Sequence, residues 1–447
     1  MHHHLKEKTS CASVHPCIQI LGPADSRMAT ARISTAFARR NSFTRLQYRG
    51  SILSQFTLVA PARTPSAAIV TLPTAHMAKT IHILGVGNIG LLFAHRLAES
   101  HGADMVNLLF HRHSLIQEWD EADRKIELVS NGIPNAQKGY GFQFLGPQND
   151  HDVSPINSLI IATKATNAIA ALKAVRPRLT SQTTVLFCQN GIGIMDELEV
   201  LFQDVAPEYI PKFMVAIVSH GVFSTKPFRA VHAGNGTVIM GSTGTAPQAP
   251  TPSTVSLSDL LCRTPALAAV HVPALQLVQA QLEKLVANAI INPLTVLFNC
   301  RNGQLFGNSQ QVDIDSHNSQ DIIRGLAFKL MHLLLEEICA VLQALPEAQR
   351  ILKKEEIFSM PRMKEVVIGV ADRTGRNISS MLQDIRAKRT TEIDYINGYV
   401  VKKGAELGIN CGVNERVVKA VKAGRIVDME EILKLFPELP GASADLN

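Results

Sequence analysis

Gly85, Gly87 and Gly90 stand at the spacing G-x-G-x-x-G, a pattern suited to holding a diphosphate. A short β-rich run, residues 79–84, precedes the pattern, and an apolar helix-like run, residues 91–98, follows it. Glycines in such a turn let the backbone approach the diphosphate, and free N–H groups at the helix start favour its negative charge. We therefore predict a dinucleotide site at Gly85, Val86, Gly87, Asn88, Ile89 and Gly90, with a ligand-free βα turn as the alternative.

Arg112 stands where a second feature of dinucleotide sites is expected. The next apolar run, residues 105–110, ends about 20 residues after Gly90. An acidic residue at this place binds the ribose 2′-hydroxyl of NAD, whereas a cation suits the 2′-phosphate of NADP. The run is followed by a His-Arg-His sequence without an acid, so we predict NADP(H) and assign Arg112 to the phosphate. A solvated loop arginine is the alternative.

Lys164 and Asn190 close two further apolar runs, residues 158–164 and 183–190, and a third run covers residues 213–219. Nearly continuous apolar runs are typical of parallel strands that are covered on both faces. In open sheets of this type, ligands bind outside the carboxyl ends of the strands. The sequence therefore predicts that both side chains lie at the ligand-binding edge of a parallel sheet.

Lys284, Asn288 and Asn292 recur at every fourth position of an apolar segment, residues 275–298. This spacing places them along one face of a helix. A buried ammonium or amide without a partner costs kilocalories, so we expect polar partners for all three, with a solvated face as the alternative. Pro293 is expected to bend or break this helix near Asn292.

Ser380 and Glu392 stand near two predicted helix starts, in residues 379–384 and 390–398. On spacing alone, Ser380 and Gln383 match a capping box. Glu392 is an acid of the kind that a helix N-terminus favours. Both residues therefore have a structural interpretation that needs no ligand.

The chain divides into three regions by pattern. Strand and helix signals alternate over residues 78–273, and helical spacing dominates residues 274–447. We predict a Rossmann-type α/β domain followed by an all-α domain. Within the first domain, a stretch rich in Pro, Thr and Ser, residues 243–256, is expected to be a surface loop, and the wider segment 243–270 has no assigned role.

The third region is a basic leader, residues 1–77. Residues 1–76 hold nine Lys or Arg and two acids, which leaves 35 basic and 36 acidic residues in the remainder. No acid occurs between Arg27 and Lys79, where seven arginines recur among Ser, Thr and Ala. This composition is typical of an organelle presequence. We expect mitochondrial targeting, with an untargeted tail on a cytoplasmic protein as the alternative.

The composition of the remainder disfavours several classes of function. Its charge is nearly balanced, so it offers no basic face for nucleic acid. It has no run of 18 apolar residues, so no transmembrane helix is expected. The seven cysteines are scattered, with no CxxC pair and no zinc-ligand spacing, so we expect neither a metal site nor a disulfide scaffold.

The blocks identified above resemble those of one family. The sequence is similar to the ketopantoate reductases, also called 2-dehydropantoate 2-reductases, over roughly residues 79–435. The resemblance is carried by Gly85–Gly90, Thr163–Ala165, Gln189–Gly191, Lys284–Thr295, Asn302-Gly303, Ser379–Arg386 and Thr391–Gly398. It implies a Rossmann domain joined to an all-helical domain like that of 6-phosphogluconate dehydrogenase. It also implies reduction of 2-dehydropantoate to (R)-pantoate by NADPH, a step towards pantothenate and coenzyme A.

The resemblance further implies a role for each matching residue. Lys284 corresponds to the general acid, and Glu392 to an essential acid that orients Lys284 and the substrate hydroxyl. The substrate-binding positions are Asn190, Asn288, Asn292, Asn302 and Ser380, of which Ser380 binds the carboxylate. Lys164 and Asn190 join the glycine motif and Arg112 in the predicted cofactor site. On this interpretation, Ser380 and Glu392 bind ligands rather than only cap helices.

Two other functions stay open at this point. A reductase of this type can act on another branched 2-oxo acid, and a nucleotide-binding sensor can keep the fold without turnover. A sensor would need neither Lys284 nor Glu392, which favours an enzyme. The expected partner is a small-molecule substrate, with no nucleic acid or membrane, and the expected assembly is a monomer or a homodimer.

Overall fold

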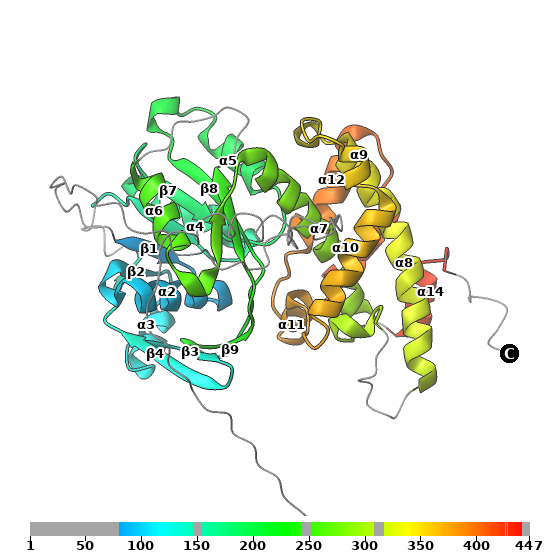
Figure 1. Cartoon of the computed structure of the whole chain (residues 1–447), viewed down its shortest axis with the longest axis horizontal. Helices are drawn as coiled ribbons and strands as arrows, with labels where there is room; N and C mark the ends of the chain where they lie inside the picture. Colours follow the sequence, from blue (N-terminus) through cyan, green and yellow to red (C-terminus); the bar gives the residue numbers. More distant parts are fainter. Residues whose placement is uncertain are drawn as a thin grey trace, which may run out of the picture. The chain divides into compact units, whose positions relative to one another are not determined.

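The computed structural model describes residues 80–146, 154–242, 252–307, 317–424, 426 and 428–439. The predicted leader, residues 1–77, lies outside the described residues. The described elements up to residue 271 include both strands and helices, and those from residue 274 onward are helical (Figure 1).

The first part of the chain is built on an eight-stranded sheet in the order β12-β11-β8-β7-β6-β1-β2-β5 (Figure 1). Its strands are β1 (Ile81–Leu84), β2 (Val106–Phe110), β5 (Gly141–Phe144), β6 (Ser158–Ile161), β7 (Thr184–Phe187), β8 (Lys212–Val218), β11 (Val238–Ser242) and β12 (Ala269–His271). The six strands from β5 to β8 in this order run parallel, and β11 is antiparallel to β8. The strand order reverses at β1, which lies between β2 and β6. This confirms the Rossmann-type sheet, in which ligands bind at such a reversal.

Helices cover both faces of this sheet. They are α2 (Asn88–His101), α3 (His113–Glu121), α4 (Ala165–Val175), α5 (Ile194–Phe202) and α6 (Pro252–Cys262). Ile83 of β1 shares one buried core with Leu91 of α2 and Leu257 of α6. The next strand residue, Leu84, belongs to a second core with Ala168 of α4. Because successive strand residues point to opposite faces, both faces need apolar side chains, which explains the continuous apolar runs.

Helix α6 corrects the expectation of a loop over residues 243–256. Residues 243–251 lie outside the described part, but the helix already begins at Pro252, a first helical position where proline is well tolerated. Thr254, Leu257 and Leu261 are buried at helical spacing. The Thr254 hydroxyl also lies 2.8 Å from that of Thr184 at the start of β7. The Pro- and Ser-rich composition concealed this short buried stripe.

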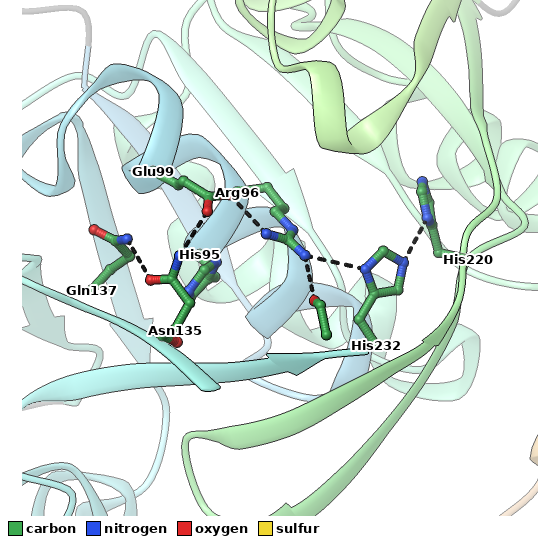
Figure 2. A network of polar contacts seen from close by, with 8 residues as sticks. His95, Arg96, Glu99, Asn135, Gln137, His220 and His232 are labelled. Atoms are coloured by element: carbon green, nitrogen blue, oxygen red, sulfur yellow. Dashed lines mark hydrogen bonds and ion pairs between the residues drawn. The ribbon is translucent and has the colours of Figure 1, made fainter. Parts of the chain in front are cut away.

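A second sheet, which the sequence did not predict, packs against α2 in the order β4-β3-β10-β9. Its strands are β3 (Lys125–Ser130), β4 (Ile133–Lys138), β9 (Gly221–Lys226) and β10 (Arg229–Gly234). Figure 2 shows the buried polar chain that joins it to the helix: Arg96 of α2 lies 3.3 Å from His232 of β10, which lies 3.0 Å from His220. Burial, with the neighbouring His220 and Arg96, lowers the pKa of His232 to about 4, so this ring is neutral at pH 7.

The second part of the chain consists of helices around one large apolar core. They are α7 (Ala274–Leu297), α8 (His317–Ala344), α9 (Lys354–Ile357), α10 (Met360–Arg373), α11 (Ser380–Arg386), α12 (Asn397–Leu407), α13 (Gly412–Lys422) and α14 (Met429–Leu435). Helix α7 is central, because α8, α10, α11 and α13 all contact it. This confirms the all-α domain. Of the helices described, none combines the length and apolar character needed to cross a membrane.

A bend or a break was predicted near Asn292, and helix α7 runs through Pro293 without a break. Pro293 has no N–H to donate to the Ala289 carbonyl one turn earlier. The side-chain amide of Asn397 donates to that carbonyl instead, at 2.9 Å. The sequence did not reveal this replacement donor, because it comes from a segment 108 residues along the chain.

Candidate active site

The glycine motif after β1 forms a turn that leaves room for a ligand on one side only. A Cβ at Gly85 would lie 2.6 Å from the Thr163 nitrogen, and one at Gly90 would lie 1.8 Å from the Gly85 oxygen. A Cβ at Gly87 would meet no atom within 4 Å. Gly87 caps α2 without a side-chain hydrogen bond, and the first turn of α2 holds no acid. The helix start is thus open and suited to an anion, which fits a dinucleotide diphosphate.

The second sheet also reaches this turn. The Ser224 hydroxyl of β9 donates to the Asn88 side-chain oxygen at 2.6 Å. This contact fixes the orientation of one motif side chain beside the open helix start. Ser224 was not predicted, because its partner Asn88 lies 136 residues away in the chain.

Arg112 follows β2 directly and caps the start of α3. Its side chain is 58% exposed and its nearest acid, Glu118, lies 3.7 Å away, so the guanidinium is only loosely held. The neighbouring His113 is held more closely, with its ring 4.1 Å from that of Phe144. An exposed cation at the carboxyl end of the strand next to β1 fits the 2′-phosphate position.

Lys284, Asn190 and Glu392 form one hydrogen-bonded cluster, although they come from three distant segments. Lys284 Nζ on α7 donates to Asn190 Oδ1 at 3.0 Å and to the Val218 carbonyl at 2.8 Å. Asn190 Nδ2 donates to Glu392 Oε2 at 3.1 Å. The other carboxylate oxygen accepts the Ala165 backbone N–H at 2.9 Å, at the start of α4. Asn190 therefore connects the lysine to the carboxylate across the carboxyl edge of the sheet.

Burial shifts the pKa of both charged members of this cluster. It lowers the pKa of Lys284 to about 8, although the Glu392 carboxylate partly opposes the shift. It also raises the pKa of Glu392, against the N–H donors from Ala165 and Asn190. An ammonium whose pKa lies close to neutral pH can release its proton readily, which suits a general acid.

Lys164, at the start of α4, is bound by the helical part of the chain. Its ammonium pairs with Asp384 Oδ1 at 2.7 Å and donates to the Thr390 carbonyl. Asp384 also accepts from Arg389 at 3.0 Å. Asp384 lies in one of the family blocks, but no role was predicted for it, because nothing local in the sequence links it to Lys164.

Replacing Asp384 with Asn should weaken NADPH binding more than it slows turnover. The Asp384 side chain is only 10% exposed, and without its charge Lys164, which is predicted to bind the cofactor, loses its ion-pair partner. We expect KM for NADPH to rise about threefold, corresponding to less than 1 kcal/mol, with kcat nearly unchanged. Arg389→Ala is the matched control, because Arg389 pairs with the same carboxylate from a more exposed side. Equal effects of the two variants in steady-state kinetics would contradict a specific role for the Lys164 pair.

The predicted substrate amides are placed at different distances from Lys284. Asn288 lines a small cavity together with Lys284 and Gln281, and Asn292 is buried one turn further along α7. Asn302 lies in a buried 3₁₀ turn, where its amide donates to Thr374 at 2.9 Å and its oxygen has no partner among the described residues. Within the described ranges, no hydrogen bond joins Asn302 to Lys284.

Ser380 is exposed at the first position of α11. The capping-box interpretation of Ser380 is wrong, because Ser379 caps the helix and accepts the Leu382 N–H at 3.1 Å. The Ser379 hydroxyl also lies 2.6 Å from that of Thr295 on α7. Glu392 likewise makes no capping bond to its own following turn, and instead binds the first N–H of α4. Neither the Ser380 nor the Glu392 side chain therefore caps its own helix.

The described ranges contain no group of three or more His, Cys, Asp or Glu side chains that could bind a metal ion.

Two family models match the chain. "Ketopantoate reductase PanE/ApbA" matches residues 81–244, and "Ketopantoate reductase PanE/ApbA C terminal" matches residues 276–425. The first range covers most of the parallel sheet, and the second covers the helices from α7 to α13.

Individual relatives agree with these matches. A ketoisovalerate reductase of Beauveria bassiana is 26% identical over 430 residues, which cover 84% of this chain and 89% of the relative. A probable 2-dehydropantoate 2-reductase of Schizosaccharomyces pombe is 28% identical over 355 residues, which cover 78% of this chain and 97% of the relative. The solved structure of a probable 2-dehydropantoate 2-reductase of Bacillus subtilis shares the fold, with a TM-score of 0.56 and 23% identity over 77% of this chain and 100% of that one. Because the two family models together match well over half of its length, the chain belongs to the ketopantoate reductase family.

Proposed function

We propose that the protein reduces 2-dehydropantoate to (R)-pantoate with NADPH, and that Lys284 is its general acid. The observation that carries this proposal is the position of the Lys284 ammonium at the carboxyl edge of the parallel sheet. The ammonium donates to two acceptors there, and its pKa is about 8. The family membership supports the wider class, an NAD(P)-dependent reductase of a 2-oxo acid.

Lys284 can carry out the proton transfer with its remaining N–H. An ammonium has three donors, of which two are bound to Asn190 Oδ1 and the Val218 carbonyl. The third is available for the ketone oxygen of the substrate. NADPH, when bound, supplies a hydride to the adjacent carbon. As the oxygen gains negative charge, the ammonium stabilises it and then donates the proton.

Glu392 and Asn190 keep this lysine charged and oriented. The carboxylate favours the ammonium form, and Asn190 presents its oxygen to Lys284 because its nitrogen is bound to Glu392. Asn288, on the same face of α7, and the exposed Ser380 hydroxyl are assigned to the substrate, with Ser380 at its carboxylate.

2-Ketoisovalerate is the second candidate substrate, because the Beauveria bassiana relative is named a ketoisovalerate reductase. 2-Dehydropantoate differs from it by a hydroxymethyl group. A site that hydrogen-bonds a substrate hydroxyl rejects an analogue without one strongly, since its polar groups are then left unpaired. The polar cluster around Glu392 therefore favours 2-dehydropantoate, which carries a hydroxyl, over 2-ketoisovalerate.

The deciding experiment is a steady-state assay of the purified chain with each 2-oxo acid, with NADPH and NADH in parallel. We expect kcat/KM to be highest for 2-dehydropantoate with NADPH. A higher value for 2-ketoisovalerate would replace the substrate and keep the reaction. Tight NADPH binding without turnover of either acid would favour a nucleotide-binding sensor and overturn the proposal.

Arg112→Asp should shift the cofactor preference from NADPH towards NADH. The Arg112 guanidinium is exposed and loosely paired, so it is free to bind a 2′-phosphate, which the introduced carboxylate would repel. We expect the ratio of kcat/KM values for the two cofactors to change by about 100-fold, or about 3 kcal/mol. Glu118→Gln, which removes the other member of the pair, is the control and should leave the ratio near that of the parent. An unchanged ratio in Arg112→Asp would remove this residue from the cofactor site.

A further inference from the structure

The carbonyl of Ala289 depends on a donor from outside its own helix. Pro293 cannot supply the N–H that a helical residue four positions later normally donates. Asn397 Nδ2 takes that place at 2.9 Å. Asn397 is completely buried, so water cannot substitute for it as a donor.

The side chain of Asn397 is fixed in orientation by a second acceptor. The same Nδ2 donates to Asn414 Oδ1 at 2.9 Å, so two acceptors face one atom and identify it as the nitrogen. Asn414, also completely buried, donates in turn to Glu337 of α8 at 2.8 Å. Glu337 further accepts the backbone N–H of Val413 and of Asn414. This chain of bonds leaves Asn397 one position only.

The two ends of the Ala289–Asn397 bond lie close in sequence to the two charged residues of the candidate site. Ala289 follows Asn288 and lies five residues after Lys284 on α7. Asn397 begins α12, five residues after Glu392. The described contacts of Lys284 and Glu392 meet only at Asn190. The Ala289–Asn397 bond therefore links the helix that carries Lys284 directly to the start of α12, five residues after Glu392.

We infer that Asn397 is a positioning residue, which uses the acceptor exposed by Pro293 to fix the Lys284 helix relative to Glu392. This inference rests on the proposed function, in which Glu392 keeps Lys284 charged for catalysis. Among the described residues, no hydrogen bond joins Asn397 to Lys284 or to the candidate substrate residues, so it acts through the helix.

The test combines Asn397→Leu, which removes the donor at similar size, with Pro293→Ala, which restores a backbone donor to the Ala289 carbonyl. We expect Asn397→Leu to lower kcat about 10- to 100-fold with KM for NADPH unchanged, because a displacement near 1 Å is costly to catalysis. Pro293→Ala alone should resemble the parent, and the double variant should recover most of the lost kcat. A kcat in the double variant as low as in Asn397→Leu would overturn the inference.

A second readout separates this inference from the proposed function. This readout is the pH at which Lys284 reacts with an acylating reagent at half of its maximal rate. The reaction is followed by mass spectrometry and does not require the enzyme to turn over. This midpoint pH should fall below about 8 in Asn397→Leu, because the Glu392 carboxylate no longer supports the ammonium, and return in the double variant. An unchanged midpoint in a folded Asn397→Leu protein would overturn the inference, whereas a parent inactive on both 2-oxo acids would overturn only the proposed function.

Should Asn397→Leu alone fail to fold, the double variant is compared with Pro293→Ala, since both carry the restored N–H. If the kcat values of these two variants agree within about threefold, the role of Asn397 is to donate a hydrogen bond to the Ala289 carbonyl. A loss of tenfold or more would show that Asn397 acts in another way, and would overturn the inference.

Discussion

Lys284→Met is expected to lower kcat for 2-oxo acid reduction by a factor of about 10² to 10⁴, with NADPH affinity nearly unchanged. Methionine keeps the length of the side chain but has no proton to donate and no charge to stabilise the ketone oxygen. The lysine binds Asn190 and the Val218 carbonyl in the described structure, and neither residue belongs to the glycine motif. Steady-state kinetics together with equilibrium NADPH titration would measure both quantities. Equal losses in kcat and in NADPH affinity would indicate a structural lysine.

The pH dependence of kcat tests the same residue independently. A general acid must be protonated, and the pKa of Lys284 is about 8. For the parent we expect kcat to be level below this pH and to fall as pH rises through it, approaching tenfold for each further unit. Lys284→Met should lose this decline, because the titrating group is gone. Lys284→Arg is the matched control, since it keeps the charge but does not release its proton in this range.

Much of the fold was accessible from sequence because its signals are local. The runs that became β1, β2, β6, β7 and β8 are apolar at nearly every position, as strands buried on both faces must be. The glycine motif likewise lies wholly within the turn that it forms. Helix α7 was predicted as residues 275–298 and spans Ala274–Leu297, because its apolar spacing extends over its full length.

The second sheet could not be predicted in this way. Strand β4 has the sequence Ile-Pro-Asn-Ala-Gln-Lys and is largely exposed, so it resembles a loop. Its neighbour β3 pairs with β10, with Glu127 opposite Arg229, about a hundred residues apart in the chain. Pairing between such distant segments leaves no periodic trace in either of them.

In the candidate site, too, some residues have a local sequence signal and others are revealed only by contacts between distant segments. Lys284 and Asn190 were singled out from their own surroundings, and Glu392 was assigned to a ligand only through the family resemblance. The Val218 carbonyl that binds Lys284 was not identified, because a backbone acceptor has no side-chain signature. The amide that replaces the missing donor at Pro293 lies 108 residues from its acceptor, so no local pattern reveals it.

Glu392→Gln is expected to lower kcat at pH 7 by about 100-fold. Its two oxygens accept from the Ala165 N–H and from Asn190 Nδ2, whereas a glutamine has a single oxygen to offer. One of these donors is then left facing an NH₂ group, and each lost charge-assisted hydrogen bond is worth about 1.5–3 kcal/mol. Asn190 would lose the contact that orients its oxygen towards Lys284. Glu392→Asp keeps the charge on a shorter side chain and should retain more activity.

The pH profile of Glu392→Gln distinguishes how this carboxylate acts. In the parent, the attraction of Glu392 raises the pKa of Lys284 against the effect of burial. Its removal should lower that pKa below about 8, so the alkaline decline of kcat should begin at a lower pH than in the parent. A fall in kcat with the decline still centred near pH 8 would mean that Glu392 acts on the substrate directly. A decline displaced to lower pH would mean that the carboxylate keeps Lys284 charged at neutral pH, which is the role that its connection through Asn190 supports.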